Sequence, residues 1–247
     1  MTQTRWMRWG MVTVVACAGF LYASDKKEKP KAADNVVDSG SFGVFVRGQR
    51  VVTETFSVQQ ENGISTVKSH LQQADASAAG QKSELLTTSG GELVRYEWSD
   101  GGSSLVVTPK DEFLIERITP ATSSKSVDQP FLLPNTSPIL DNNFFIHREL
   151  LAWRYLSANC HPEGGDEKCL QGGLEFGVLV PQDRTSMRVR VELVGPEKIR
   201  FKGTDRELLR LNLMGESFSW ALWVDPKDQF KLMRVLVAAD NTEVVRD

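Results

Sequence analysis

The sequence predicts a mainly β fold: a large curved antiparallel sheet or half-open barrel, with one central helix at about residues 142–158 packed on its concave face. Apolar and polar residues alternate through most segments after residue 40, which is typical of strands with one buried face. By contrast, residues 142–158 contain no Gly or Pro and carry apolar side chains on most of the helical circumference. Such a helix must be enclosed, and a large twisted sheet that curls can enclose it.

The chain divides into three parts: an export signal or membrane anchor at 1–23, a flexible tether at 24–40, and a single β-rich domain with the central helix at 41–247. Arg5 and Arg8 precede an apolar run that is too short to span a bilayer comfortably, which is the pattern of an export signal. The charged residues that follow show no periodicity. We therefore expect an exported protein, periplasmic or anchored to the membrane so that it faces the periplasm.

The signal contains a candidate lipidation site. Val14-Val15-Ala16-Cys17 resembles the lipobox of bacterial lipoproteins, in which the cysteine is lipidated and becomes the new N-terminus. The apolar run before Cys17 is short and continues past it to Tyr22. Cleavage after Ala18 or Ala23, or retention as an anchor, therefore remain alternatives to lipidation of Cys17.

The first half of the domain reads as an antiparallel meander. Strands are expected at 42–46, 51–58, 64–71, 83–88, 92–98, 104–108 and 113–118. The turns between them are rich in Gly, Asn, Asp and Pro, and Asn62-Gly63 is the pair that primed hairpin turns favour.

The predicted helix follows a segment that is rich in proline. Pro130, Pro134 and Pro138 end any preceding element, and Asp141 is a good N-cap residue. Asn143, His147 and Arg154 form the main polar stripe of the helix. The stripe either meets solvent or a satisfied hydrogen-bond network, or it binds an anionic headgroup through the guanidinium fork of Arg154.

The second half repeats the alternation with stronger strands, expected at 174–180, 187–193, 209–213, 218–224 and 230–238, with a short last strand. These bring the expected total to roughly a dozen strands. Trp220 shares an apolar face with Phe218 and Leu222 and reads as core. Trp223 points the other way, which predicts a surface or groove position.

Cys160 and Cys169 bracket a polar loop that contains Gly164-Gly165. In an oxidising compartment such a pair predicts a disulfide that fixes the exit of the helix. A metal site built from Cys160, His161 and Cys169, with Asp166, is the competing interpretation, but the sequence has no second metal-binding element to complete it. We expect the disulfide and no metal.

Charge and motifs exclude several functions. The net charge is -3, and Lys and Arg are interleaved with Asp and Glu, so nucleic acid is not an expected partner. No Gly-x-Ser-x-Gly, His-Glu-x-x-His, Walker or Rossmann pattern is present. We therefore assign no catalytic residue and no cofactor. A hydrolase is the least expected of three possible functions.

The combination of export signal, tether, curved meander, proline-rich approach to the helix and closing hairpin resembles uncharacterised bacterial secreted β proteins whose open barrel is similar to that of the periplasmic lipoprotein carriers. The closing hairpin reads Trp-Ala-Leu-Trp-Val-Asp, a turn, and Lys-Leu-Met-Arg-Val. The resemblance implies a half-barrel around a helix that shields or binds acyl chains.

The expected function is that of a non-enzymatic envelope protein that binds or shields an apolar ligand, either a lipid or a lipidated partner. The alternative is a structural or assembly component of the envelope with a packed interior. The helix carries more large apolar side chains than one sheet face can cover, so some of them are expected to line a groove. The candidate ligand-binding residues are Asn143, Phe144, His147, Leu151, Arg154, Tyr155 and Trp223.

Overall fold

The computed structural model describes residues 35–247 except 75–79, 124, 164–165 and 171. Residues Asp34–Asp247 form one compact unit. The predicted export signal, most of the predicted tether and Cys17 lie outside the described residues. Within the described part, no helix is long and apolar enough to cross a membrane.

The unit is built on a fourteen-stranded sheet in which every neighbouring pair is antiparallel, with the order β11-β12-β13-β14-β15-β16-β1-β2-β3-β4-β5-β6-β7-β8. Its first half consists of β1 (Val36–Val46), β2 (Gln49–Glu61), β3 (Ile64–Gln73), β4 (Gln81–Thr88), β5 (Leu93–Ser99), β6 (Ser104–Lys110), β7 (Phe113–Thr119) and β8 (Val127–Phe131). Its second half consists of β11 (Gly173–Val180), β12 (Thr185–Phe201), β13 (Thr204–Met214), β14 (Ser219–Asp225), β15 (Lys231–Val237) and β16 (Thr242–Arg246). A separate hairpin pairs β9 (Cys160–Glu163) with β10 (Asp166–Cys169).

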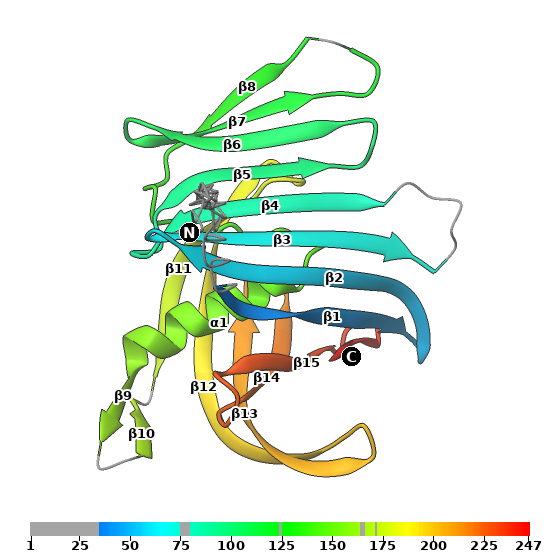
Figure 1. Cartoon of the computed structure of the whole chain (residues 1–247), viewed down its shortest axis with the longest axis vertical. Coiled ribbons are helices and arrows are strands. Elements are labelled where there is room, and N and C mark those ends of the chain that lie inside the picture. The colour runs from blue at the N-terminus through cyan, green and yellow to red at the C-terminus, as the bar shows by residue number, and fades with distance from the viewer. Residues whose placement is uncertain (1–34, 75–79, 124, 164–165, 171) are drawn as a thin grey trace, which may run out of the picture. The chain divides into compact units, whose positions relative to one another are not determined.

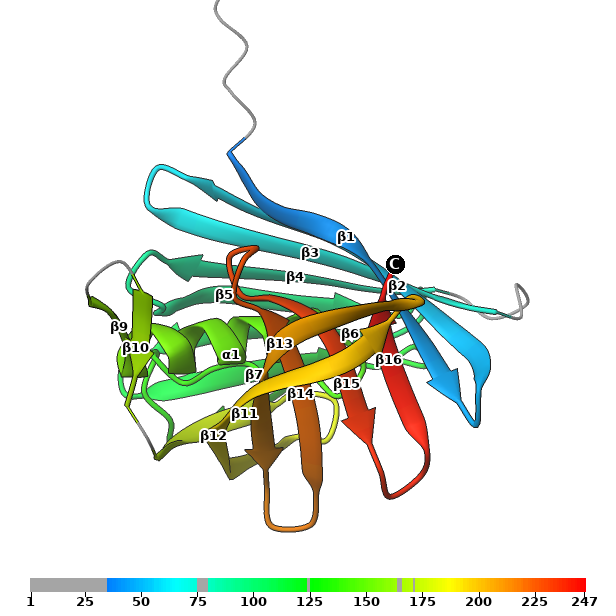
Figure 2. The ribbon, with the colours of Figure 1, turned by 90° about the horizontal axis from the view of Figure 1, so that it is seen from below.

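The sheet curls so that its two halves face each other, with α1 (Ile146–Asn159) between them (Figure 1 and Figure 2). It does not close, because β8 and β11 are the two ends of the strand order. The segment before the helix lies along β11: the Leu140 N–H donates to the Leu179 carbonyl at 2.9 Å, and the Leu179 N–H donates to the Pro138 carbonyl at 3.0 Å. The predicted curved antiparallel sheet with a helix on its concave face is confirmed.

The main core lies between the two halves of the sheet and surrounds the helix. It joins Tyr96, Val107 and Leu114 of the first half to Val178, Leu211 and Leu222 of the second, and to Phe144, Ile146, Leu151 and Tyr155 on or next to α1. Each of these side chains is at most 3% exposed. Fully burying a side chain of this size stabilises a fold by roughly 1.5–3 kcal/mol, so burial of the helix surface contributes strongly to its docking.

A second apolar cluster lies on the opposite face of the sheet. It contains Ile199, Phe201, Leu208, Trp223 and Met233, where the long β12–β13 hairpin curls over (Figure 1). Trp223 therefore does point away from the main core, as its position in the alternation predicts. It is only 3% exposed, however, and lies in this cluster rather than in a groove.

The helix is shorter at its start than the sequence predicts. It begins at Ile146, with Phe145 as the N-cap residue and no side-chain cap from that residue. Asp141 is not the cap: its Oδ1 accepts the Asn143 N–H at 2.8 Å and forms a local turn. The predicted start at residue 142 and the predicted cap are both wrong, because Glu54 from the sheet supplies the cap instead.

The strands also differ from the prediction in three places. β1 begins at Val36, so the end of the predicted tether at 24–40 is already part of the sheet. β8 occupies a stretch expected to be irregular, and its Pro130 is tolerated because the strand lies at the sheet edge. The predicted polar loop between the cysteines contains the β9–β10 hairpin.

Candidate functional site

The disulfide predicted at the exit of the helix is present. Cys160 and Cys169 are bonded, and they face each other in the register of the β9–β10 hairpin directly after α1. Both sulfur atoms are used in the bond, so these cysteines are not free to act as the thiolate ligands of the competing metal site. A disulfide is compatible with an oxidising compartment.

A cavity of about 380 Å³ lies between α1 and the concave face of β1–β5, and we call it the helix cavity. The sheet side of the lining consists of Val37, Val58, Gln60, Ser65, Val67, Leu85, Thr87, Thr88, Ser89, Gly90, Gly91 and Leu93, and the other side consists of Ser137, Pro138, Ile139, His147, Leu150, Leu151, Trp153, Arg154 and Ser157.

The floor of the helix cavity is apolar and its opening is polar. Val58, Val67, Leu85, Leu93 and Leu151 are each at most 4% exposed. The exposed lining residues are Val37, Gln60, Ser89, Gly90 and Ser157, so the opening lies between one edge of β1–β5 and the last turn of the helix. An amphipathic molecule would place its apolar part on the floor.

Arg154 is half-buried on this side of the helix. Its guanidinium carbon lies 6.0 Å from the centre of the Phe176 ring, and a Cβ atom built on Gly91 would lie 3.8 Å from its Nη1. No carboxylate among the described residues forms an ion pair with Arg154, and burial lowers the pKa of its guanidinium. Arg154 remains protonated, because an arginine is not deprotonated in proteins. It therefore offers a positive charge to the cavity.

His147 lies deeper and is only 1% exposed. Its Nδ1 accepts the backbone N–H of Asp141 at 3.1 Å. The ring lies edge-on to Tyr96, with centroids 5.6 Å apart, and close to Phe144. Burial lowers the pKa of His147 to about 3, so the side chain is neutral. His147 is therefore an interior residue of the cavity rather than part of a polar mouth.

The remaining sequence candidates lie elsewhere. Phe144 and Tyr155 are fully buried in the main core, and the Tyr155 hydroxyl donates to the Gly172 carbonyl at 2.7 Å while it accepts the Leu193 N–H at 3.0 Å. Asn143 donates to Gln81 at 2.9 Å, beside a separate cavity of about 230 Å³. The structure thus brings His147, Leu151 and Arg154 together at the helix cavity and places Asn143, Phe144, Tyr155 and Trp223 outside it.

Sequence reasoning missed the sheet side of the cavity. Alternation indicates that Val58, Val67 and Leu85 face inward, but it does not indicate which strands lie opposite the helix. That information comes from the register, in which Val58 pairs with Val67 and Val67 pairs with Leu85. A row of small or aliphatic residues therefore crosses three strands beneath the helix.

The start of the helix is held by a buried polar network. The Glu54 carboxylate accepts the Phe145 and Ile146 N–H groups and the Ser69 hydroxyl. Burial raises the pKa of Glu54 to about 7. Nearby, the Asp141 carboxylate accepts the Tyr96 hydroxyl and the Gln182 amide. These groups are enclosed in the core, so they position the helix and the ring of His147.

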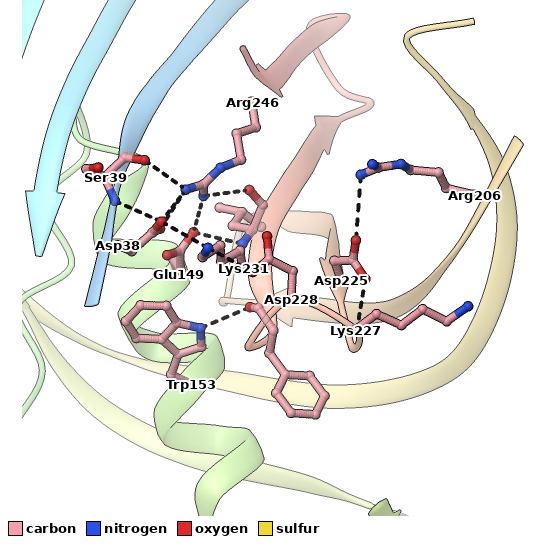
Figure 3. Close-up of polar contacts among 12 residues, drawn as sticks. Asp38, Ser39, Glu149, Trp153, Arg206, Asp225, Lys227, Asp228, Lys231 and Arg246 are labelled. Carbon is pink, nitrogen blue, oxygen red and sulfur yellow. Dashed lines mark hydrogen bonds and ion pairs between the residues drawn. The ribbon is translucent and has the colours of Figure 1, made fainter. Parts of the chain in front are cut away.

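A second network holds the first turn of the helix through Glu149 (Figure 3). Glu149 Oε2 accepts the Leu232 N–H at 2.7 Å and Arg246 Nη1 at 3.1 Å. Arg246 Nη2 also contacts both oxygens of Asp38, at 2.5 and 2.7 Å, and Lys231 Nζ lies 3.8 Å from Asp38. Burial and the neighbouring Asp38 carboxylate raise the pKa of Glu149. The network ties α1 to β1, β15 and β16.

A larger hollow of about 650 Å³ lies on the outward face of β2–β6. Its side chains include Lys68, His70, Lys82, Glu84 and Glu97, which alternate with the residues of the concave face. Charged side chains of both signs line this open surface, so it is a weaker candidate than the helix cavity for an apolar ligand.

No protein-family model and no curated protein matches the chain. Among solved structures, the chain is similar to a beta-barrel-like protein of a domain of unknown function, DUF1849, from Brucella abortus. The two are 5% identical, the match covers 87% of this chain and 97% of that one, and the TM-score is 0.39. At this level of similarity the match identifies neither a family nor a function for this chain.

Proposed function

We propose that this protein is an exported envelope protein that binds the acyl chain of a lipid or of a lipidated partner in the helix cavity. Arg154 contacts the anionic group of the ligand. The observation that carries the proposal is the helix cavity itself, which combines an apolar floor with a guanidinium that has no acidic partner among the described residues.

The size and lining of the cavity suit one hydrocarbon chain. Its volume of about 380 Å³ falls in the range of about 300–1,000 Å³ that is usual for ligand pockets. Burial of each methylene contributes about 0.8 kcal/mol, so a dozen would give on the order of 10 kcal/mol before the costs of ordering and association. Those costs are about 4 kcal/mol or more, which leaves about 6 kcal/mol at most and a Kd of tens of micromolar or weaker.

The cavity is held open by the rest of the fold. Glu54 fixes the start of α1 and Arg246 fixes its first turn through Glu149, so the helix cannot settle onto β3–β5 without breaking buried hydrogen bonds. A preformed pocket lowers the cost of binding because little of the protein is ordered on association. This argument supports the carrier-like function that the sequence resemblance implies.

Compartment and membrane association belong to the same proposal. The sequence pattern at 1–23 and the disulfide Cys160–Cys169 together favour the periplasm. Lipidation of Cys17 would hold the domain near a membrane through residues 24–35, where lipids and lipidated proteins are available. Nucleic acid is not a proposed partner, and no reaction is assigned.

The alternative function is that of a structural or assembly component of the envelope. The observation that favours it is the dense packing around Phe144, Ile146 and Tyr155, each of which is fully buried in the core. In that case the helix cavity would hold water, and the fold would serve partners through its surface.

Binding of cis-parinaric acid, whose fluorescence rises in apolar surroundings, tests the proposal on delipidated protein. Arg154→Ala should weaken binding of the acid roughly tenfold and leave its methyl ester unchanged, because only the acid makes a charge-assisted contact. Arg154→Lys is the matched control and should retain most of the affinity. Equal effects of Arg154→Ala on acid and ester, or no binding by the folded wild type, would favour the structural alternative.

A further inference from the structure

His147 lines the helix cavity, and its Nε2 is a buried polar atom with no hydrogen-bond partner in the described part of the chain. The side chain is 1% exposed, so bulk water does not satisfy it. Buried polar groups in proteins are nearly always hydrogen-bonded, and the exceptions need an explanation. At the wall of an apolar cavity, the natural explanation is a partner on the ligand.

The hydrogen-bonding character of this atom follows from its ring. Nδ1 accepts the Asp141 N–H, so the proton of the neutral imidazole is on Nε2. Tyr96 and Phe144 pack against the ring and hold its orientation. Nε2 therefore presents a fixed hydrogen-bond donor that can be satisfied only by an acceptor.

The two residues lie at a defined spacing along the helix. His147 and Arg154 are seven residues apart, which places them on one face of α1, with their Cα atoms separated by about 10 Å along the helix axis at 1.5 Å per residue. Leu150 and Leu151 line the cavity between them. A chain that follows the helix from Arg154 would meet apolar side chains first and the Nε2–H group afterwards.

We propose that His147 is a specificity-determining residue, which selects acyl ligands that carry an oxygen acceptor in mid-chain, such as a hydroxyl or keto group, separated by several methylenes from the anionic group at Arg154. This inference rests on the proposed function. A plain alkyl chain can fill the cavity but leaves the donor unsatisfied, whereas an oxygen at the right position satisfies it. An oxygen next to the headgroup would not reach it.

The test compares stearate, 2-hydroxystearate and 10-hydroxystearate as competitors of cis-parinaric acid on the delipidated wild-type protein. The 10-hydroxy acid should bind about three- to tenfold more tightly than stearate, which is the net effect of one neutral hydrogen bond. The 2-hydroxy acid should show no gain over stearate. Equal affinity for all three would overturn the inference and leave the proposed function standing, whereas absence of binding for all three would overturn both.

His147→Phe provides the matched variant, because it keeps a planar ring and removes the donor. It also removes the Nδ1 acceptor of the Asp141 N–H, so its affinities for the two ligands are compared with each other rather than with those of wild type. It should bind the 10-hydroxy acid less well than stearate, since the hydroxyl is then buried without a partner. A preference for the 10-hydroxy acid that survives in a folded His147→Phe protein would overturn the assignment.

A measurement on the wild type covers the case in which His147→Phe does not fold. The ¹⁵N and ¹H resonances of Nε2–H, assigned through the coupled Nδ1, should shift on addition of 10-hydroxystearate and not on addition of stearate. Identical spectra with the two ligands, both bound, would contradict direct donation from His147.

Discussion

The carboxylate of Glu54, on β2, caps the helix that begins ninety-two residues later at Ile146. Oε2 of Glu54 accepts the Phe145 N–H at 2.6 Å, and Oε1 accepts the Ile146 N–H at 3.3 Å. The first N–H groups of a helix have no partner within it, and a carboxylate at that end also interacts favourably with the helix dipole. One side chain of the sheet thus fixes where the helix starts and how it docks.

Glu54→Ala should lower the free energy of unfolding by about 2 kcal/mol or more, because two buried N–H groups and the Ser69 hydroxyl lose their acceptor. Urea denaturation followed by Trp fluorescence measures the change. Glu61→Ala, at the exposed end of the same strand, is the control and should stay within about 0.5 kcal/mol of wild type. A change at Glu54 as small as that at Glu61 would refute the capping role.

Part of this arrangement could have been predicted from the sequence. Glu54 lies in the alternation with Val52, Phe56 and Val58, on the face that proves to be buried. A carboxylate on the apolar face of a strand needs a partner, and this signal marks Glu54 as unusual. Its partner could not be predicted, because strand order and curvature, rather than local pattern, bring residue 54 next to residue 145.

The fold class could be predicted from the sequence more fully than the site. Apolar and charged residues alternate in β12, where Arg188 and Arg190 alternate with Val189 and Val191. This alternation indicates one buried face, and both valines are indeed 1% exposed. The apolar circumference of the helix correctly indicates enclosure. The helix cavity depends on long-range register and on where packing is incomplete, and no local pattern carries that information. Trp223 shows the limit of prediction from local pattern. The face of the strand on which Trp223 lies could be predicted, but the curled β12–β13 hairpin that covers it could not.

Glu116, on β7, is fully buried, and neither of its carboxylate oxygens has a partner in the described part of the chain. Burial raises its pKa to about 7 from the ordinary value of 4.5, although Arg184 opposes the shift. A carboxyl group whose pKa is higher in the folded state binds more protons there, so stability falls as the pH rises from about 4.5 to about 7.

Glu116→Leu should therefore stabilise the protein by on the order of 2 kcal/mol at pH 8, and should have a much smaller effect at pH 4. The free energy of unfolding measured across this pH range checks the slope as well as the size. Glu112→Leu, at an exposed position before the same strand, should leave the slope unchanged. An unaltered slope in Glu116→Leu would show that Glu116 does not titrate as described.

Arg246 balances two buried carboxylates, those of Glu149 and Asp38, and is itself 8% exposed. Arg246→Ala should lower the free energy of unfolding by about 3–5 kcal/mol, because both buried carboxylates lose their nearest positive charge. Arg50→Ala is the control: Arg50 pairs with Asp247 at the surface, with side chains 38% and 34% exposed, and its loss should cost less than about 1 kcal/mol. Similar costs for the two variants would contradict the difference in burial.

The Cys160–Cys169 disulfide closes a short loop at the exit of the helix. Replacing both cysteines by serine should destabilise the protein by about 2–3 kcal/mol in the chain-entropy model if the hairpin unfolds with the rest of the domain. Intact mass after alkylation, with and without reductant, should show two protected thiols in the exported wild type. Two reactive thiols before reduction would contradict the bond.

Whether the helix cavity holds an acyl chain is tested most directly by titration of cis-parinaric acid against wild type and two variants of adjacent residues on β3. Ser65 lines the cavity, whereas Thr66 alternates to the outward face. Ser65→Phe should place a ring inside the cavity and weaken binding strongly, while Thr66→Phe should bind like wild type, with the fold of both checked by circular dichroism. Saturable binding that is undiminished in a folded Ser65→Phe protein, or no binding by wild type, would contradict binding of an acyl chain in the helix cavity.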